Sequence, residues 1–293
     1  MVGRRPRRKR SRQALLSSIE AAQNDDLASE RSTLALPYLA AWLKKDPEFP
    51  RPAFRPIYSV VLTLFVMSAT RGRQTYASSQ ILIQALLASG LSSAEYRDLI
   101  ADVEELAGEG AGVETAFWLL EVLEDFMQAI APEADARATF LHSTLSKLAP
   151  LYGRLSSLQR AAVDLIATEL GWTVGSLGAP AIAAPPPDDL AARLKGKRIA
   201  IYTLTEAVSR QAATLITQAV PEAIVDCNAD HGGSTQLKAL AENADIFVLV
   251  WQSAKHAATD FIRVHRGNRP LLFASGRGVS SILRSIEDHV LSC

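Results

Sequence analysis

The sequence has only two cysteines, Cys227 and Cys293, and their separation fits neither a metal-ligand pattern nor a disulfide framework. We therefore expect a cytoplasmic protein, in a reducing compartment, rather than a secreted disulfide scaffold. Long apolar runs are also missing, since the most apolar segment, 57–69, is too short to cross a bilayer. The Arg-rich start is not followed by the apolar run of a signal peptide. No membrane segment is predicted.

Net charge is absent as well, with 31 basic and 31 acidic residues, but the charges are unevenly distributed. Residues 13–194 carry a net charge of −9, and residues 195–293 one of +2. Residues 1–12 hold no acid and seven basic residues: Arg4, Arg5, Arg7, Arg8, Lys9, Arg10 and Arg12. Because like charges repel and bury nothing, 1–12 is predicted to be a disordered tail. Non-specific nucleic-acid binding is expected from this tail; the alternative is that it only aids solubility.

Residues 13–175 show a helical pattern and are predicted to form an all-helical domain. Their leucine, alanine and aromatic positions recur at spacings of three and four, as in a helical bundle. Helices are expected over 32–45, 57–70, 78–88, 92–107, 114–130, 132–148 and 156–170. Ser92 and Glu95 have the spacing of a capping box. We expect this domain to bind a partner protein.

Residues 176–194 are predicted to be a linker rich in alanine and proline. The three consecutive prolines at 185–187 favour a stiff polyproline II spacer, which cannot join a packed element. Limited proteolysis is therefore expected to cut within 179–188 and to leave two stable pieces.

Residues 195–293 alternate short apolar runs with amphipathic segments four times. The runs are 199–202, 223–226, 246–250 and 271–274. This alternation is typical of βαβ units and predicts a small Rossmann-like α/β domain with four parallel strands in the flavodoxin-like order 2-1-3-4. Thr203 and Glu206 have capping-box spacing at the start of the next helix. The predicted fold class is thus α + α/β.

Parallel sheets bind ligands outside the carboxyl ends of their strands. The candidate ligand-binding residues there are Thr203, Thr205, Ser253, Lys255, His256, Ser275, Gly276, Arg277, Gly278 and Ser280. Helix amino termini, two cations and two glycines suit a phosphate or carboxylate, so an anion or nucleotide site is expected. Lys255, His256, Arg277 and the Ser280 hydroxyl are expected to converge.

Other interpretations of these residues stay open. The glycine-rich turn at 275–281 matches neither a Walker loop nor a dinucleotide fingerprint, and geometry alone can require it. Lys255 and His256 can be solvated residues at a helix start, and Trp251 a core or rim residue. No metal site is predicted, and neither catalytic residues nor a cofactor can be assigned.

Residues 244–256, Ala-Asp-Ile-Phe-Val-Leu-Val-Trp-Gln-Ser-Ala-Lys-His, resemble the central signature of a bacterial Rossmann-like domain family of unknown function. Residues 260–265, 269–274 and 278–284 continue the resemblance, which covers the C-terminal third. The resemblance implies a component of the kind found in some phage-defence or DNA-modification gene clusters. The first strand ends in Tyr-Thr-Leu-Thr rather than the glycine-rich turn of some members, which speaks against dinucleotide binding.

Three hypotheses for function follow. The leading one is a non-catalytic, ligand-sensing or scaffolding component of a bacterial multi-gene system, such as anti-phage defence or DNA modification. The alternative is an enzyme, a nucleotide hydrolase or glycosidase, with Lys255 and His256 as the reactive pair. Against it stands the lack of a carboxylate predicted at a strand end of the crevice. The third is a purely structural subunit.

Overall fold

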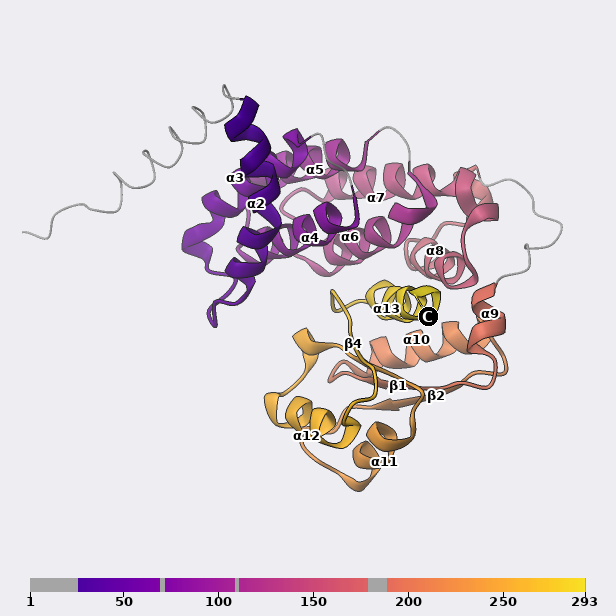
Figure 1. The fold of residues 1–293 in the computed structure, drawn as a ribbon. Coiled ribbons are helices and arrows are strands. Elements are labelled where there is room, and N and C mark those ends of the chain that lie inside the picture. Colours follow the sequence, from indigo (N-terminus) through magenta and orange to yellow (C-terminus); the bar gives the residue numbers. More distant parts are fainter. Residues whose placement is uncertain (1–25, 69–71, 109–110, 179–188, 293) are drawn as a thin grey trace, which may run out of the picture. The chain divides into compact units, whose positions relative to one another are not determined.

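The computed structural model describes residues 26–68, 72–108, 111–178 and 189–292. The basic tail 1–12 and residues 179–188 of the predicted linker lie outside these ranges, so both expectations stay predictions. The chain divides into two compact units, Met1–Ser89 and Gly90–Cys293, and each is described by itself (Figure 1). Within the described ranges, no helix combines the length and apolar character that a membrane crossing needs.

The first unit is helical in its described part. It consists of α2 (Asp26–Lys44), the short 3-10 helix η1 (Pro52–Phe54), α3 (Arg55–Met67) and α4 (Arg73–Ala88). The helices predicted at 32–45, 57–70 and 78–88 are found. Helices α2 and α4 begin several residues earlier than predicted, α3 ends at Met67, and positions 69–70 lie outside the described residues. Proline-rich residues separate α2 from α3, because proline lacks an amide donor. Tyr58, Leu62 and Leu82 are buried in its core.

The second unit begins with helices that also match the expected pattern. They are α5 (Ser93–Ala107), η2 (Val113–Thr115), α6 (Ala116–Gln128), α7 (Ala134–Leu148), η3 (Ala149–Arg154), α8 (Ser157–Glu169) and η4 (Gly175–Leu177). The capping box at α5 is confirmed: the Ser92 N–H donates to Glu95 Oε2 at 2.9 Å, and the Glu95 N–H donates to Ser92 Oγ at 3.4 Å. The rings of Tyr96, Phe126 and Phe140 pack together in the core.

The α/β part of this unit confirms the predicted sheet. Its elements are α9 (Asp189–Leu194), β1 (Arg198–Tyr202), α10 (Glu206–Ala219), β2 (Ile224–Asn228), α11 (Thr235–Asn243), β3 (Ile246–Leu249), η5 (Trp251–Ser253), α12 (His256–Arg266), β4 (Leu271–Phe273) and α13 (Val279–Ser292). The strands are parallel and lie in the order β2-β1-β3-β4. Every residue of β3 is buried, as expected for a central strand.

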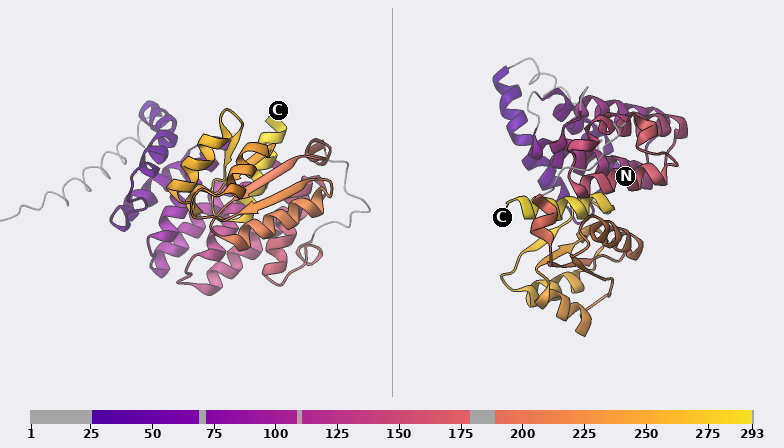
Figure 2. Two further views of the ribbon diagram at one scale, coloured as in Figure 1. Left: turned by 90° about the horizontal axis from the view of Figure 1, so that it is seen from below. Right: turned by 90° about the vertical axis from the view of Figure 1, so that its right-hand side faces the viewer.

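Helices cover both faces of this sheet. Figures 1 and 2 show α11 and α12 on one face and α10 and α13 on the other. Tyr202, Phe247 and Leu249 of the sheet pack with Leu237 and Ile262 in one apolar cluster. The carboxyl ends of the strands therefore meet at one edge, between the two helix layers, where a ligand would be expected.

The second predicted capping box, at the start of α10, is wrong. Thr205, not Thr203, precedes the helix, and its side chain makes no capping hydrogen bond. The Thr203 hydroxyl instead accepts the N–H of Thr205 at 3.2 Å. Residues 204 and 205 lie outside the helix, which begins at Glu206. Thr203 and Glu206 therefore do not share a helical turn, and no capping box forms between them.

The helices of residues 90–178 pack directly on the α/β part. Helices α6 and α8 contact α13, and α8 also contacts α10. The Gln211 amide donates to Glu169 Oε1 at 3.0 Å, and the Ser156 hydroxyl donates to the Glu287 carboxylate. The division of the chain into compact units lies between Ser89 and Gly90, and the domain boundary expected at 176–194 stays a prediction.

Candidate ligand site at the carboxyl edge of the sheet

The loops after β1 and β3 lie against each other. The hydroxyls of Thr205 and Ser253 are 2.8 Å apart, and the N–H of Leu204 donates to the Ser253 carbonyl at 2.8 Å. Adjacent parallel strands bring these loops together, as the predicted strand order requires. Thr203 is fully buried, and its hydroxyl accepts a hydrogen bond within its own loop. Thr205 and Ser253, but not Thr203, are therefore accessible at this edge.

Lys255 and His256 stand at the start of α12. Lys255 is the residue before the first helical turn, and both side chains are exposed. Among the described residues, neither side chain makes an ion pair. Behind them, the Tyr202 hydroxyl donates to the Asp230 carbonyl at 2.7 Å. Burial raises the pKa of Tyr202, although the backbone N–H of Lys255 opposes this shift. The Tyr202 hydroxyl is thus neutral and links the loops after β2 and β3.

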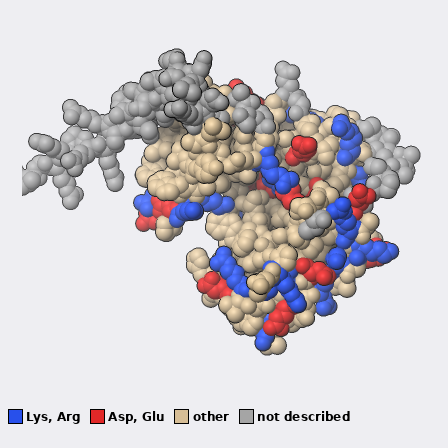
Figure 3. Space-filling view, viewed as in Figure 1, with Lys and Arg blue, Asp and Glu red and all other residues tan. Residues whose placement is uncertain are grey.

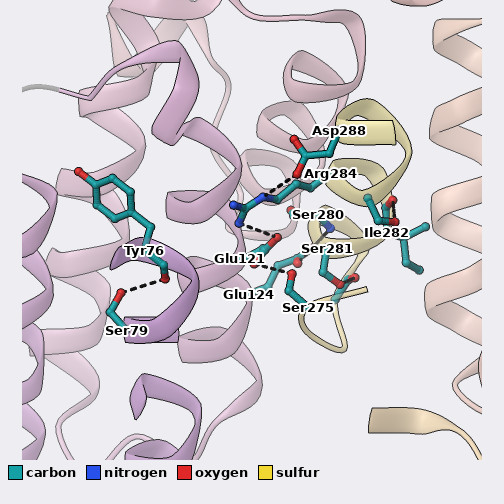
Figure 4. Close-up of polar contacts among 12 residues, drawn as sticks. Tyr76, Ser79, Glu121, Glu124, Ser275, Ser280, Ser281, Ile282, Arg284 and Asp288 are labelled. Atoms are coloured by element: carbon teal, nitrogen blue, oxygen red, sulfur yellow. Dashed lines mark hydrogen bonds and ion pairs between the residues drawn. The ribbon is translucent and has the colours of Figure 1, made fainter. Parts of the chain in front are cut away.

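The loop between β4 and α13 has a different environment, because α6 covers it. The N–H of Ser280 donates to both carboxyl oxygens of Glu124, at 3.0 and 3.1 Å (Figure 4). Gly278 has no side chain for a physical reason: a Cβ there would lie 2.0 Å from Glu124 Oε2. A carboxyl of the chain itself therefore occupies the start of α13, where an anion is favoured by the free N–H groups and the helix dipole.

A second carboxyl from the same helix face holds the other end of this loop. Glu121 Oε2 accepts the Ser275 hydroxyl at 2.9 Å, and Glu121 Oε1 lies 3.4 Å from the Arg284 guanidinium (Figure 4). Arg284 in turn lies 3.7 Å from Asp288. The Gln252 amide donates to the Ser275 carbonyl at 3.0 Å, which ties this loop to the one after β3.

The two glutamates of α6 are buried, and the pKa of each is raised. Both are less than a tenth exposed. Burial raises the pKa of Glu124 to about 8, a shift that the Ser280 N–H opposes and the neighbouring Glu121 carboxyl reinforces. Burial also raises the pKa of Glu121, against the opposing effect of Arg284 and Ser275. Because the two carboxyls are coupled, we expect the pair to hold at least one proton at neutral pH.

The ten predicted ligand-binding residues therefore fall into two groups. Thr205, Ser253, Lys255, His256 and Arg277 are wholly or partly exposed, whereas Thr203, Gly276, Gly278 and Ser280 are buried and Ser275 is bonded to Glu121. Ser280 consequently does not join Lys255 and His256 in an open crevice. Its hydroxyl is buried and has no hydrogen-bond partner in the described structure.

Glu121 and Glu124 were not among the residues that the sequence singled out. They sit in an otherwise apolar segment, Ala116-Phe-Trp-Leu-Leu-Glu-Val-Leu-Glu, and are separated by three positions. A separation of three positions puts both side chains on one helix face. This spacing within an apolar segment is the sequence feature from which the pair could have been predicted. Among the described residues, no three histidine, cysteine, aspartate or glutamate side chains form a group that could hold a metal ion.

Comparison with protein families matches nearly all of the chain. The model of a family described as DpdD-like matches residues 4–285, nearly the whole chain. No curated protein and no solved structure matches the chain. This match covers the helical residues as well as the α/β part, so the expected restriction of a family resemblance to the C-terminal third is not confirmed.

Proposed function

The chain belongs to the DpdD-like family, which is associated with DNA modification and phage defence, and we propose that it is a non-catalytic scaffolding and ligand-sensing component of such a system. The observation that carries this proposal is the occupied start of α13. Free amide donors at a helix start are a common way to hold a phosphate for transfer, and here Glu124 takes the Ser280 N–H. The β4–α13 loop then serves as an internal contact surface for α6.

An anion is proposed to bind at the remaining open part of the edge. Lys255 and His256 present a cation and an imidazole at the start of an 11-residue helix, next to the paired hydroxyls of Thr205 and Ser253. Their side chains are exposed, so a phosphate could replace water rather than protein contacts. Charge-assisted hydrogen bonds to such a group contribute roughly 1.5–3 kcal/mol each. A nucleotide phosphate is the ligand class that this chemistry favours.

The test is the thermal stability of the purified chain with a panel of nucleotides. A member of the panel should raise the melting temperature of the wild type, and Lys255→Ala should weaken its binding about ten- to a hundredfold. Lys195→Ala is the control, because Lys195 is an exposed lysine that precedes β1, at the opposite edge of the sheet. If no nucleotide shifts the melting temperature, or if both variants lose the shift equally, the site is wrong. Turnover of a nucleotide would refute the non-catalytic role.

The helical residues are proposed to bind another protein of the same system. On α2, Leu34, Tyr38 and Trp42 are spaced by four and are 68 %, 73 % and 68 % exposed. Residues four apart share a helix face, so these side chains form one apolar stripe. An exposed apolar stripe of this kind is typical of a protein-binding surface.

Binding to each purified protein encoded in the same gene cluster tests this surface. Trp42→Ala should weaken the binding of one of them, since aromatic residues dominate such interfaces. Ile130→Ala is the control, because Ile130 is an exposed apolar residue of the second unit. Equal affinity of wild type and Trp42→Ala for every cluster protein would refute α2 as the docking helix.

A further inference from the structure

Positive charge gathers in one stretch of the α/β part. Residues 251–278 contain five basic residues and one acidic residue, in a chain whose net charge is zero. Arg266 is buried and donates to the carbonyls of Ala241, Ala244, Asp245 and Pro270, so its role is structural. The other four, Lys255, Arg263, Arg269 and Arg277, are exposed.

The exposed cations of this stretch are poorly compensated. Asp260 is its one acid and lies 3.8 Å from Arg263, and the side chains of Lys255, Arg269 and Arg277 make no ion pair with the described residues. Elsewhere in the same unit several exposed cations have acidic partners, as in Arg210–Glu206 at 3.0 Å. Figure 3 shows this general intermixing of basic and acidic side chains. The uncompensated charge makes the stretch attractive to a polyanion.

Exposed aromatic rings accompany these cations. Phe273 ends the edge strand β4 and is 46 % exposed, and the Arg263 guanidinium carbon lies 5.7 Å from the centre of its ring. Trp251, which is 39 % exposed, follows two residues after Leu249, the register partner of Phe273. The two rings and the Arg263 guanidinium therefore lie at the carboxyl end of neighbouring strands, and Arg269 lies two residues before the start of β4.

We propose that this α12–β4 surface, defined as Trp251, Arg263, Arg269 and Phe273, binds single-stranded DNA. Arginines would contact phosphates, and bases would stack on the exposed rings or on the guanidinium plane. A single strand fits better than a duplex, because paired bases do not offer their faces to protein rings. The choice of DNA over RNA rests on the proposed function, whereas the choice of a single-stranded polyanion rests on charge and aromatic exposure.

The experiment measures fluorescence anisotropy of a labelled oligothymidine with the full chain. Arg263→Gln and Arg269→Gln should each weaken binding about three- to tenfold at low salt and lower the slope of log affinity against log salt by about 0.7. Arg210→Gln is the matched control: it removes an equally exposed arginine from α10, on the opposite face of the sheet. Phe273→Leu keeps an apolar residue but removes the ring, and should weaken binding about fivefold or more. Melting temperatures check that each variant is folded.

Each alternative result overturns the proposal. Equal weakening by Arg210→Gln would mean a diffuse charge effect, and equal affinity for the matched duplex would exclude base stacking. Repeating the titrations without residues 1–12 removes the basic tail, and complete loss of binding then would assign the interaction to that tail. Tighter binding of the corresponding RNA would reject DNA as the partner. The nucleotide test at Lys255 is unaffected by any of these variants, so the two proposals fail separately.

Discussion

Replacing Glu124 by glutamine should remove a pH dependence from the stability of the second unit. In the folded chain the pKa of Glu124 is about 8, because the carboxyl is buried beside Glu121, whereas the free carboxyl titrates near 4.5. Between these values the folded chain holds a proton that the unfolded chain releases. The stability that this proton contributes is complete below about pH 4.5 and is lost as the pH rises through about 8.

The expected loss of stability follows from the difference in bound protons between the folded and the unfolded chain. One proton bound only by the folded state changes the free energy of unfolding by about 1.4 kcal/mol per pH unit. From pH 6 to pH 8 the wild type should therefore lose about 2–3 kcal/mol, and Glu124→Gln should lose much less. The amide is nearly the same size as the carboxyl and has no charge. Its oxygen can still accept the Ser280 N–H, so the variant should be the more stable protein at pH 9.

The measurement is urea unfolding between pH 6 and pH 9, followed by hydrogen exchange in α6 and α13 so that the second unit is observed. Glu105→Gln is the control, because Glu105 lies exposed on α5 and undergoes the same chemical change. A wild-type stability that does not fall with pH would refute the buried acid. So would a slope that Glu124→Gln shares with the wild type.

Two further substitutions test the packing on which the site depends. Gly278→Ala should destabilise the second unit by about 1–3 kcal/mol or more, because the new Cβ would overlap Glu124, and Glu124→Ala in the same chain should recover part of this loss. Chemical denaturation of the four chains measures the coupling, and additive effects would contradict the contact. On α2, Trp42→Ala should change the unfolding free energy by less than about 0.5 kcal/mol, whereas Leu43→Ala, which removes a buried side chain, should cost about 2–5 kcal/mol. A large loss in Trp42→Ala would mean that the chain itself covers the apolar stripe.

The sheet could be predicted from the sequence because local pattern determines it. Short branched runs such as 246–250, each followed by an amphipathic segment, leave few topologies other than a right-handed parallel sheet. The observed order β2-β1-β3-β4 agrees. Helices with strong caps were also predictable, as Ser92 and Glu95 show. The start of α4 was missed, because Gly72 before it offers no capping side chain, whereas the start of α2 was missed although Asn24-Asp25 precedes it in the sequence.

The contacts of the site could not be predicted in the same way. Glutamates in a helix are expected at its solvent-facing side, and only tertiary packing shows that Glu121 and Glu124 face the β4–α13 loop. The division at Ser89–Gly90 is not marked in the sequence for a related reason, because Ser89-Gly90 has the appearance of a simple helix break.

The loop at Ser275–Ser280 shows which part of the site's chemistry could be inferred from the sequence and which could not. Its glycines and helix start were interpreted as suited to a phosphate or carboxylate, and a carboxyl does lie there, contributed by α6. An anion from solution would have to displace Glu124 and leave this buried acid without its donor, which costs more than filling an open site. The loop residues that favour an anion therefore bind the carboxyls of α6 and connect this helix to the α/β part. The ligand contacts that we propose are therefore those of exposed side chains, Lys255 and His256.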